Sequence, residues 1–184
     1  DEVEAELLVP AGVGAPAQRA PVQREAHAGE QHEERDHPLR RGRELGTSTV
    51  GIVGFGRIGQ GVARRLSGFG TRVLAADPFM TDEQITALGA EPATLASIAA
   101  ESDIVSLHAP GGQLVADAAW LAAMKPGMLL VNTARPDLVD ETTLADALRS
   151  GRLGGYAADT LDGDTAGSHD SPLLAADLAE RVVI

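Results

Sequence analysis

The chain has 184 residues and a formal net charge of −12, with 43% hydrophobic but only 3% aromatic residues. Its acidic balance excludes nucleic acid and anionic membrane surfaces as partners, because both need a basic face. The absence of cysteine excludes disulfides, thiolate metal sites and a cysteine nucleophile and fits a cytoplasmic location, and no apolar run approaches the length of a membrane span.

Residues 1–46 differ in composition from the rest of the chain. Prolines and glycines between positions 10 and 16 interrupt the one stretch that could begin a helix, and mixed charges with few large apolar residues follow. This composition predicts an irregular or disordered segment, or alternatively a helix that packs on a missing part of the protein. The spacing of His27, His32 and His37 suits neither face of a helix, so we expect no metal site there.

From Thr47 onward, short apolar strands alternate with amphipathic helices. We expect strands over 48–55, 71–77, 103–110, 127–134 and 153–159, with the beginning of a sixth at 181–184. We expect helices over 57–69, 81–88, 94–102, 116–124 and 140–151. The alternation implies a parallel sheet that is covered on both faces. We therefore predict one doubly wound α/β domain, a Rossmann domain, from about 47 to 184.

Two local patterns support the predicted helices. Thr81 and Gln84 form a capping-box pattern at the start of the second helix. In the first helix, four apolar residues share one helical face: Ile58, Val62, Leu66 and Phe69.

Gly54, Gly56 and Gly59 form a G-x-G-x-x-G motif directly behind the first strand and at the start of the first helix. In dinucleotide sites these glycines permit, in turn, a tight turn, close approach of the backbone to the pyrophosphate, and close packing of helix on strand. Asp77 ends the next strand about 20 residues further on, where an acid would bind the adenine ribose and repel a 2′-phosphate. The pattern predicts an NAD site; the alternative is a sharp turn without a ligand.

Polar residues also follow the later strands, at His108, at residues 132–135 and at Asp159. The carboxyl ends of parallel strands lie along one edge of a sheet, where open α/β folds bind ligands. We therefore expect these residues to line the same crevice. For His108, a capped strand end without a ligand is an equal alternative.

Six stretches, in order, resemble the NAD-binding domain of the D-isomer-specific 2-hydroxyacid dehydrogenases, a family that includes phosphoglycerate dehydrogenase: VGIVGFGRIG, AADP, DIVSLHAP, MKPGMLLVNTAR, LVDETTLADALRSGRLGGYAAD and SPLL. The resemblance covers roughly residues 44–184. It implies hydride transfer between NAD(H) and a 2-hydroxy or 2-oxo acid, with a histidine as proton donor or acceptor. Because this family dimerises largely through this domain, the resemblance also implies a possible homodimer.

The resemblance assigns roles to individual positions. Arg135 would bind the substrate carboxylate and polarise its carbonyl, and Asp159 would contact the nicotinamide end. Asp164 stands where the family usually has the glutamate that orients the histidine. From the residues alone, Arg135 also fits a surface arginine, and Asp162 with Asp164 fits a polar turn. The remaining implied contacts to the cofactor are Arg57, Ile58, Pro78, His108, Ala109, Pro110, Thr133 and Ala134.

The chain departs from the family pattern in several places. Pro136 replaces the usual glycine after the arginine and removes a backbone donor, and the loop after Pro110 is shorter than in the family. Asp164 is one methylene shorter than glutamate. By the family pattern the catalytic histidine is expected beyond Ile184, and His169 is not expected to replace it.

The substrate-binding domain of the family is not recognisable in the sequence. We therefore expect an NAD-binding domain without a complete catalytic machine, that is, a dehydrogenase that is truncated. One alternative is a non-catalytic NAD(H)-binding module that senses redox state or binds a partner. A third is a structural domain without a ligand.

Overall fold

The computed structural model describes residues 42–162 and 170–184. The strands are β1 (Thr49–Val53), β2 (Arg72–Ala76), β3 (Glu91–Pro92), β4 (Ile104–Leu107), β5 (Met128–Asn132), β6 (Leu153–Ala158) and β7 (Val182–Val183). The α-helices are α1 (Arg57–Leu66), α2 (Asp82–Ala87), α3 (Leu95–Glu101), α4 (Ala118–Ala123) and α5 (Glu141–Arg149). Short 3-10 helices are η2 (Leu45–Thr47), η3 (Ser67–Phe69), η4 (Pro136–Leu138), η6 (Pro172–Leu174) and η7 (Ala176–Leu178).

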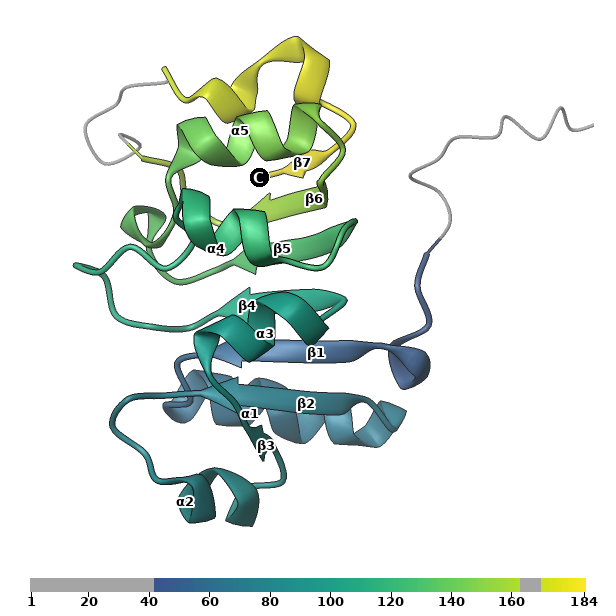
Figure 1. The fold of residues 1–184 in the computed structure, drawn as a ribbon, viewed down its shortest axis with the longest axis vertical. Coiled ribbons are helices and arrows are strands. Elements are labelled where there is room, and N and C mark those ends of the chain that lie inside the picture. The colour runs from purple at the N-terminus through teal and green to yellow at the C-terminus, as the bar shows by residue number, and fades with distance from the viewer. Residues whose placement is uncertain (1–41, 163–169) are drawn as a thin grey trace, which may run out of the picture. The chain divides into compact units, whose positions relative to one another are not determined.

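The strands form one sheet in the order β3-β2-β1-β4-β5-β6-β7, and every neighbouring pair is parallel (Figure 1). This arrangement confirms the predicted doubly wound α/β class. Each predicted strand and helix is present within a few residues of its expected bounds. The capping box is also formed, because the Thr81 side chain accepts the backbone N–H of Gln84 while the Gln84 side chain accepts that of Thr81.

Among the strands of the described residues, β3 is the one that the sequence patterns did not predict. It consists of the exposed pair Glu91 and Pro92, which lies beside Leu74 and Ala75 of β2. An apolar run is absent here because β3 is an edge strand, where proline is tolerated and little surface is buried.

Two buried clusters cover the two faces of the sheet. On one face, Val50, Ile52 and Val73 pack with residues from α1 and α2. On the other face, α3, α4 and α5 lie side by side over the sheet (Figure 1) and contribute residues such as Ile98 and Leu144 to the larger cluster. Successive residues of a strand point to opposite faces, which explains why these strands are apolar almost throughout.

Helix α1 has its fully buried positions at small residues, while Val62 and Leu66 of the predicted apolar face pack partly buried against the same cluster. Gly59 and Ala63 are the buried positions. Ile58 and Phe69 are 70% and 61% exposed, although the sequence pattern grouped them with Val62 on one face. The reason is close approach: Gly59 lies directly over the carbonyl of Gly54, so the helix faces β1 with its smallest residues.

The beginning of β1 is fastened to the residue before β4. The Asp103 carboxylate accepts the backbone N–H of Thr49 at 2.9 Å and an Nζ–H of Lys125 at 2.6 Å. The guanidinium of Arg43 lies 3.5 Å from the same carboxylate, whose side chain is 17% exposed. The hydrogen bond from Lys125, followed by that from Thr49, lowers the pKa of Asp103.

Replacing Asp103 with alanine is expected to lower the free energy of unfolding by about 2 kcal/mol near neutral pH, because charge-assisted hydrogen bonds are lost. Since the pKa of Asp103 is lowered on folding, its stabilisation is present above the unfolded pKa of about 4 and is lost as pH falls through the folded value. Urea titrations of both proteins at several pH values measure this difference. A difference that stays constant down to about pH 2 would contradict it.

None of the helices within the described residues is long and apolar enough to cross a membrane.

Candidate functional site

The strand order places a crevice at the carboxyl ends of β1 and β4. From β1 the chain adds β2 and β3 on one side of the sheet, and then returns to add β4 on the other side. Open α/β sheets bind ligands at such a reversal, because the loops above the two central strands separate there. A cavity of about 550 Å³ lies at this point. Its lining includes Gly54, Asp77, Pro78, Ala109, Pro110 and Gly112.

Gly54 forms the floor of the turn between β1 and α1. Its φ is 88°, and a Cβ at this position would lie 2.5 Å from the backbone nitrogen of Ala109. The backbone N–H of Gly54 donates to the carbonyl of Ala76 at 2.9 Å. A residue with a side chain would therefore push β4 away from β1, so glycine is needed here for the fold itself.

Gly56 has no comparable structural reason to be glycine. Its φ is −70°, and a Cβ would meet no atom within 4 Å. It is the N-cap of α1, and no side chain caps this end of the helix. The N–H groups of Arg57 and Ile58 open this ten-residue helix. A helix N-terminus facing open space favours an anion such as a diphosphate, and a glycine there lets the anion approach.

Asp77 holds the glycine loop from the end of β2. Its Oδ2 accepts the backbone N–H of Phe55 at 2.7 Å, and its Oδ1 accepts that of Phe79 at 2.9 Å. A carboxylate has about four acceptor positions. Asp77 therefore keeps the capacity to accept two hydroxyl donors while it holds the loop, as binding of a ribose requires. The glycines, the helix end and Asp77 thus fit a dinucleotide.

The turn after β5 is shaped by Asn132, whose part sequence reasoning did not predict. Asn132 is 2% exposed. Its side-chain amide donates to the carbonyl of Arg135 at 2.8 Å and accepts the backbone N–H of Ala134 at 3.1 Å. An asparagine at a strand end often forms such a local turn, which is the signal that could have revealed it.

The predicted residues after β5 and β6 lie beside one another but do not line the 550 Å³ cavity. The Asp159 backbone N–H donates to the carbonyl of Asn132 at 3.2 Å, which joins the two strand ends. Thr133 and Arg135 are exposed, Ala134 is half-buried, and the guanidinium of Arg135 donates to the carbonyl of Ala134 at 2.9 Å.

His108 lies half-buried at the end of β4. Its Nε2 is 2.9 Å from the hydroxyl of Ser106, two residues earlier on the same strand. Burial lowers the pKa of His108, so the ring is neutral near neutral pH. The ring therefore pairs with its own strand, as in the alternative of a capped strand end, and it is not among the residues that line the cavity.

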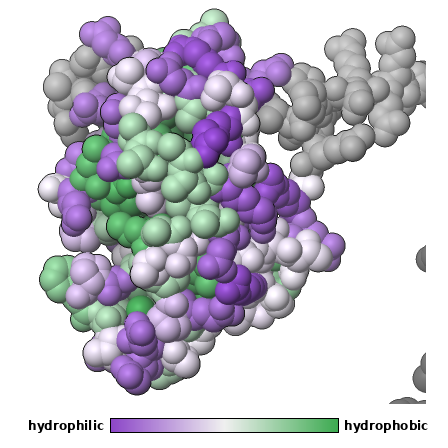
Figure 2. Space-filling model, viewed as in Figure 1, coloured by the Kyte–Doolittle hydropathy of each residue, from purple (hydrophilic) through white to green (hydrophobic). Residues whose placement is uncertain are grey.

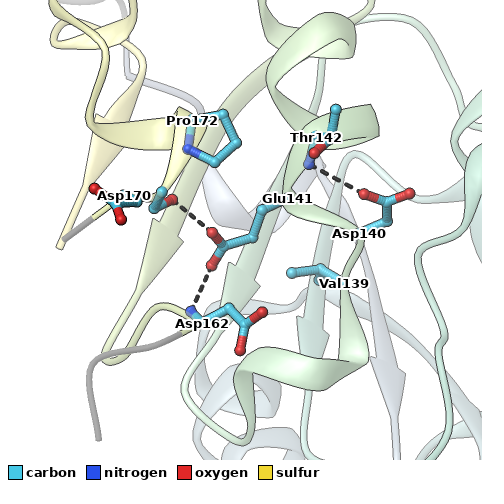
Figure 3. Close-up of a pocket in the computed structure, with 8 residues that line it drawn as sticks. Val139, Asp140, Glu141, Thr142, Asp162, Asp170 and Pro172 are labelled. Carbon is cyan, nitrogen blue, oxygen red and sulfur yellow. Dashed lines mark hydrogen bonds between the residues drawn. The ribbon is translucent and has the colours of Figure 1, made fainter. Parts of the chain in front are cut away.

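A second cavity, of about 370 Å³, lies at the start of α5 (Figure 3). The buried carboxylate of Glu141 accepts the backbone N–H of Asp162 at 2.7 Å and the hydroxyl of Ser171 at 2.5 Å. Sequence reasoning did not predict this contact, because the residues that meet are far apart in the chain. Five positions considered above lie outside the described residues: His27, His32, His37, Asp164 and His169.

Comparisons with known proteins agree with this geometry. Residues 17–184 match the model of the family "D-isomer specific 2-hydroxyacid dehydrogenase, NAD binding domain". D-3-phosphoglycerate dehydrogenase of Mycobacterium leprae is 41% identical over 145 residues, which cover 77% of this chain and 27% of that protein.

Two solved structures resemble the fold closely. The structure of a D-2-hydroxyisocaproate dehydrogenase superposes with a TM-score of 0.69 at 34% identity, and covers 78% of this chain and 46% of that one. An NAD-complexed D-isomer-specific 2-hydroxyacid dehydrogenase of Lactobacillus delbrueckii ssp. bulgaricus superposes with a TM-score of 0.67 at 33% identity, over 78% and 47% of the two chains. The chain thus spans less than half the length of each of these three relatives. It belongs to the D-isomer-specific 2-hydroxyacid dehydrogenase family, as the NAD-binding domain of that family.

Proposed function

We propose that the crevice between β1 and β4 binds NAD(H), and that the protein transfers hydride between this cofactor and a 2-hydroxy or 2-oxo acid. The observation that carries the proposal is Gly56, where an open space lies in front of the uncapped start of α1. The fold does not require glycine at this position, whereas a diphosphate against the helix end does.

Each part of the crevice has a proposed role. Gly54 and Gly59 hold the loop and the helix close to the sheet, and the N–H groups of Arg57 and Ile58 bind the diphosphate. Asp77 binds the adenine ribose and disfavours the 2′-phosphate of NADP(H). Pro78, His108, Ala109, Pro110, Thr133, Ala134 and Asp159 are the remaining proposed contacts to the cofactor.

When bound, the nicotinamide supplies or accepts the hydride. We propose that Arg135 binds the carboxylate of the 2-oxo acid through its guanidinium fork. Support comes from its exposure and from the Asn132 turn that holds its backbone. Asp164 is proposed to orient the proton-transferring histidine of the family, and this residue lies outside the described residues. An assay of NADH oxidation with 2-oxo acids distinguishes the two proposed functions. A dehydrogenase would oxidise NADH in this assay, whereas a non-catalytic NAD(H)-binding module would not.

We also propose a homodimer and a cytoplasmic location. Figure 2 shows hydrophobic surface over α3 and α4 in the middle of the viewed face. Helix α4 is rich in alanine, and Ala118, Ala119, Ala122 and Ala123 are all exposed, as is Leu114 just before it. Contiguous apolar surface of this kind favours association. Light scattering that gives the mass of one chain would contradict the dimer.

The proposed cytoplasmic location is supported by the cysteine-free composition, which fits a reducing compartment.

Calorimetric titration of the 184-residue chain with NADH tests the cofactor site. We expect one saturable site per chain in the unchanged protein. Gly56→Ala is expected to remain folded but to bind NADH at least about 10-fold more weakly, because its methyl group would take space that the diphosphate needs. Gly61→Ala on the same helix is the control, with binding unchanged. Absence of binding at millimolar NADH, or equal binding by Gly56→Ala, would contradict the site.

A further inference from the structure

One wall of the cofactor crevice is the segment from Gly111 to Ala116, between β4 and α4. Gly111, Gly112 and Gln113 line the cavity on this side, while Asp77 and Pro78 line it on the other. This segment forms no helix or strand of its own. Its position must therefore be set by contacts with another part of the chain.

The far end of this wall is attached to the segment that follows β5. The backbone N–H groups of Val115 and Ala116 both donate to the carbonyl of Leu138 at 2.9 Å. The N–H of Asp140 donates back to the carbonyl of Ala116 at 3.3 Å. These bonds hold the wall at its base, next to α4.

The tip of the wall is attached through Asp137. Its Oδ2 accepts the backbone N–H of Gly112 at 2.6 Å, a short charge-assisted hydrogen bond. The conformation at Gly111 and Gly112 leaves room for this carboxylate. A Cβ on Gly111 would lie 2.8 and 2.9 Å from the two carboxylate oxygens, and the φ of Gly112 is 91°.

We propose that Asp137 is a positioning residue for the cofactor, which sets the width of the crevice by holding Gly112 across from Asp77. Asp137 is exposed and does not itself line the cavity, so it acts through the backbone of the wall. The same short segment carries Arg135, so Asp137 also joins the cofactor wall to the turn that bears the proposed substrate arginine. The inference rests on the proposed binding of NAD(H) in this cavity.

The negative charge of Asp137 and its hydrogen bond to Gly112 are expected to have opposite effects on the affinity for the dinucleotide. A carboxylate close to the crevice repels an anionic dinucleotide, so a purely electrostatic role predicts that removing the charge tightens binding. A positioning role predicts that removing the hydrogen-bond acceptor weakens binding. Asp137→Asn separates the two, since the asparagine side chain keeps an acceptor for Gly112 and loses the charge.

The test is a set of NADH titrations at one ionic strength, with a thermal melt of each protein. We expect Asp137→Ala to bind NADH about 5-fold more weakly than the unchanged protein, with Asp137→Asn in between. Gly111→Ala keeps the charge but displaces the carboxylate, and is expected to weaken binding as Asp137→Ala does. Asp146→Ala, which removes an exposed charge from α5, is the matched control with affinity unchanged.

Unchanged or tighter binding by Asp137→Ala would overturn the inference, as would equal affinity of the alanine and asparagine variants. A loss of melting temperature without a loss of affinity would show a merely structural contact and would also overturn it. If Asp137→Ala does not fold, the NADH affinity of Gly111→Ala decides, and unchanged or tighter binding by that variant would overturn the inference. Failure of the unchanged protein to bind NADH would instead contradict the proposed function, so the two failures are distinguishable.

Discussion

Gly59→Ala is expected to lower the free energy of unfolding by about 3 kcal/mol, because a methyl group at this position would overlap atoms of the neighbouring backbone. It would collide with the carbonyl oxygen of Gly54 and lie 3.1 Å from the side chain of Ile52. The obstacle is backbone at the floor of the glycine loop, which cannot move without shifting β1 or α1. NADH binding is expected to be lost together with stability, since the loop and the helix end move apart.

The matched control lies two residues further along α1. A Cβ on Gly61 would meet only the flexible end of Arg65, at 3.4 Å. Since alanine favours a helix interior over glycine, Gly61→Ala is expected to raise the free energy of unfolding by about 1 kcal/mol. Urea denaturation measures both variants. Changes of the same sign in the two variants would contradict close packing of α1 on β1 through Gly59.

Asp77→Ala is expected to weaken NADH binding by about 10- to 100-fold and to abolish the preference for NADH over NADPH. The carboxylate holds the N–H groups of Phe55 and Phe79 even without a ligand, so its loss loosens the glycine loop as well as removing the ribose acceptors. The loss of preference has a separate cause, because the repulsion of the 2′-phosphate disappears with the charge.

Asp77→Asn distinguishes these two causes. The asparagine side chain still accepts one backbone N–H and so preserves part of the loop contact, but it carries no charge. We expect it to retain more NADH affinity than Asp77→Ala while showing the same loss of preference. Titration of each variant with NADH and NADPH gives both quantities. A preference for NADH that survives in both variants would show that Asp77 does not select the cofactor.

Much of the fold could be predicted from the sequence because each central strand is a short apolar run, and because α2, α3, α4 and α5 each begin at a residue whose side chain caps the helix. The capping box at Thr81 and the apolar strand before Asp77 are local patterns, and both are present in the structure. Strand β3 escaped prediction because an exposed edge pair needs no apolar residues. The apolar face of α1 was predicted only in part, because Val62 and Leu66 pack on the core whereas Ile58 and Phe69 are exposed. Small residues make the closest contact with the sheet, and a search for large apolar residues does not find them.

In the candidate site too, some features could be predicted from local sequence patterns and others could not. The glycines and Asp77 belong to one local motif, and Gly54 and Asp77 of this motif line the 550 Å³ cavity. The contacts of Asp137 with Gly112 and of Glu141 with Ser171 join residues that are distant in the chain. Such pairs depend on how the loops after different strands fold against each other, and no local pattern encodes that. The roles of the individual site residues remain predictions.

A crystal structure of the chain with NAD⁺ tests the central claim most directly. We predict that the diphosphate lies against the N–H groups of Arg57 and Ile58 in front of Gly56, with the adenine ribose hydroxyls within hydrogen-bonding distance of Asp77. Asp137 is predicted to keep its bond to Gly112 in that complex. A cofactor bound elsewhere on the molecule, or crystals that contain none at saturating NAD⁺, would contradict the assignment of the crevice between β1 and β4.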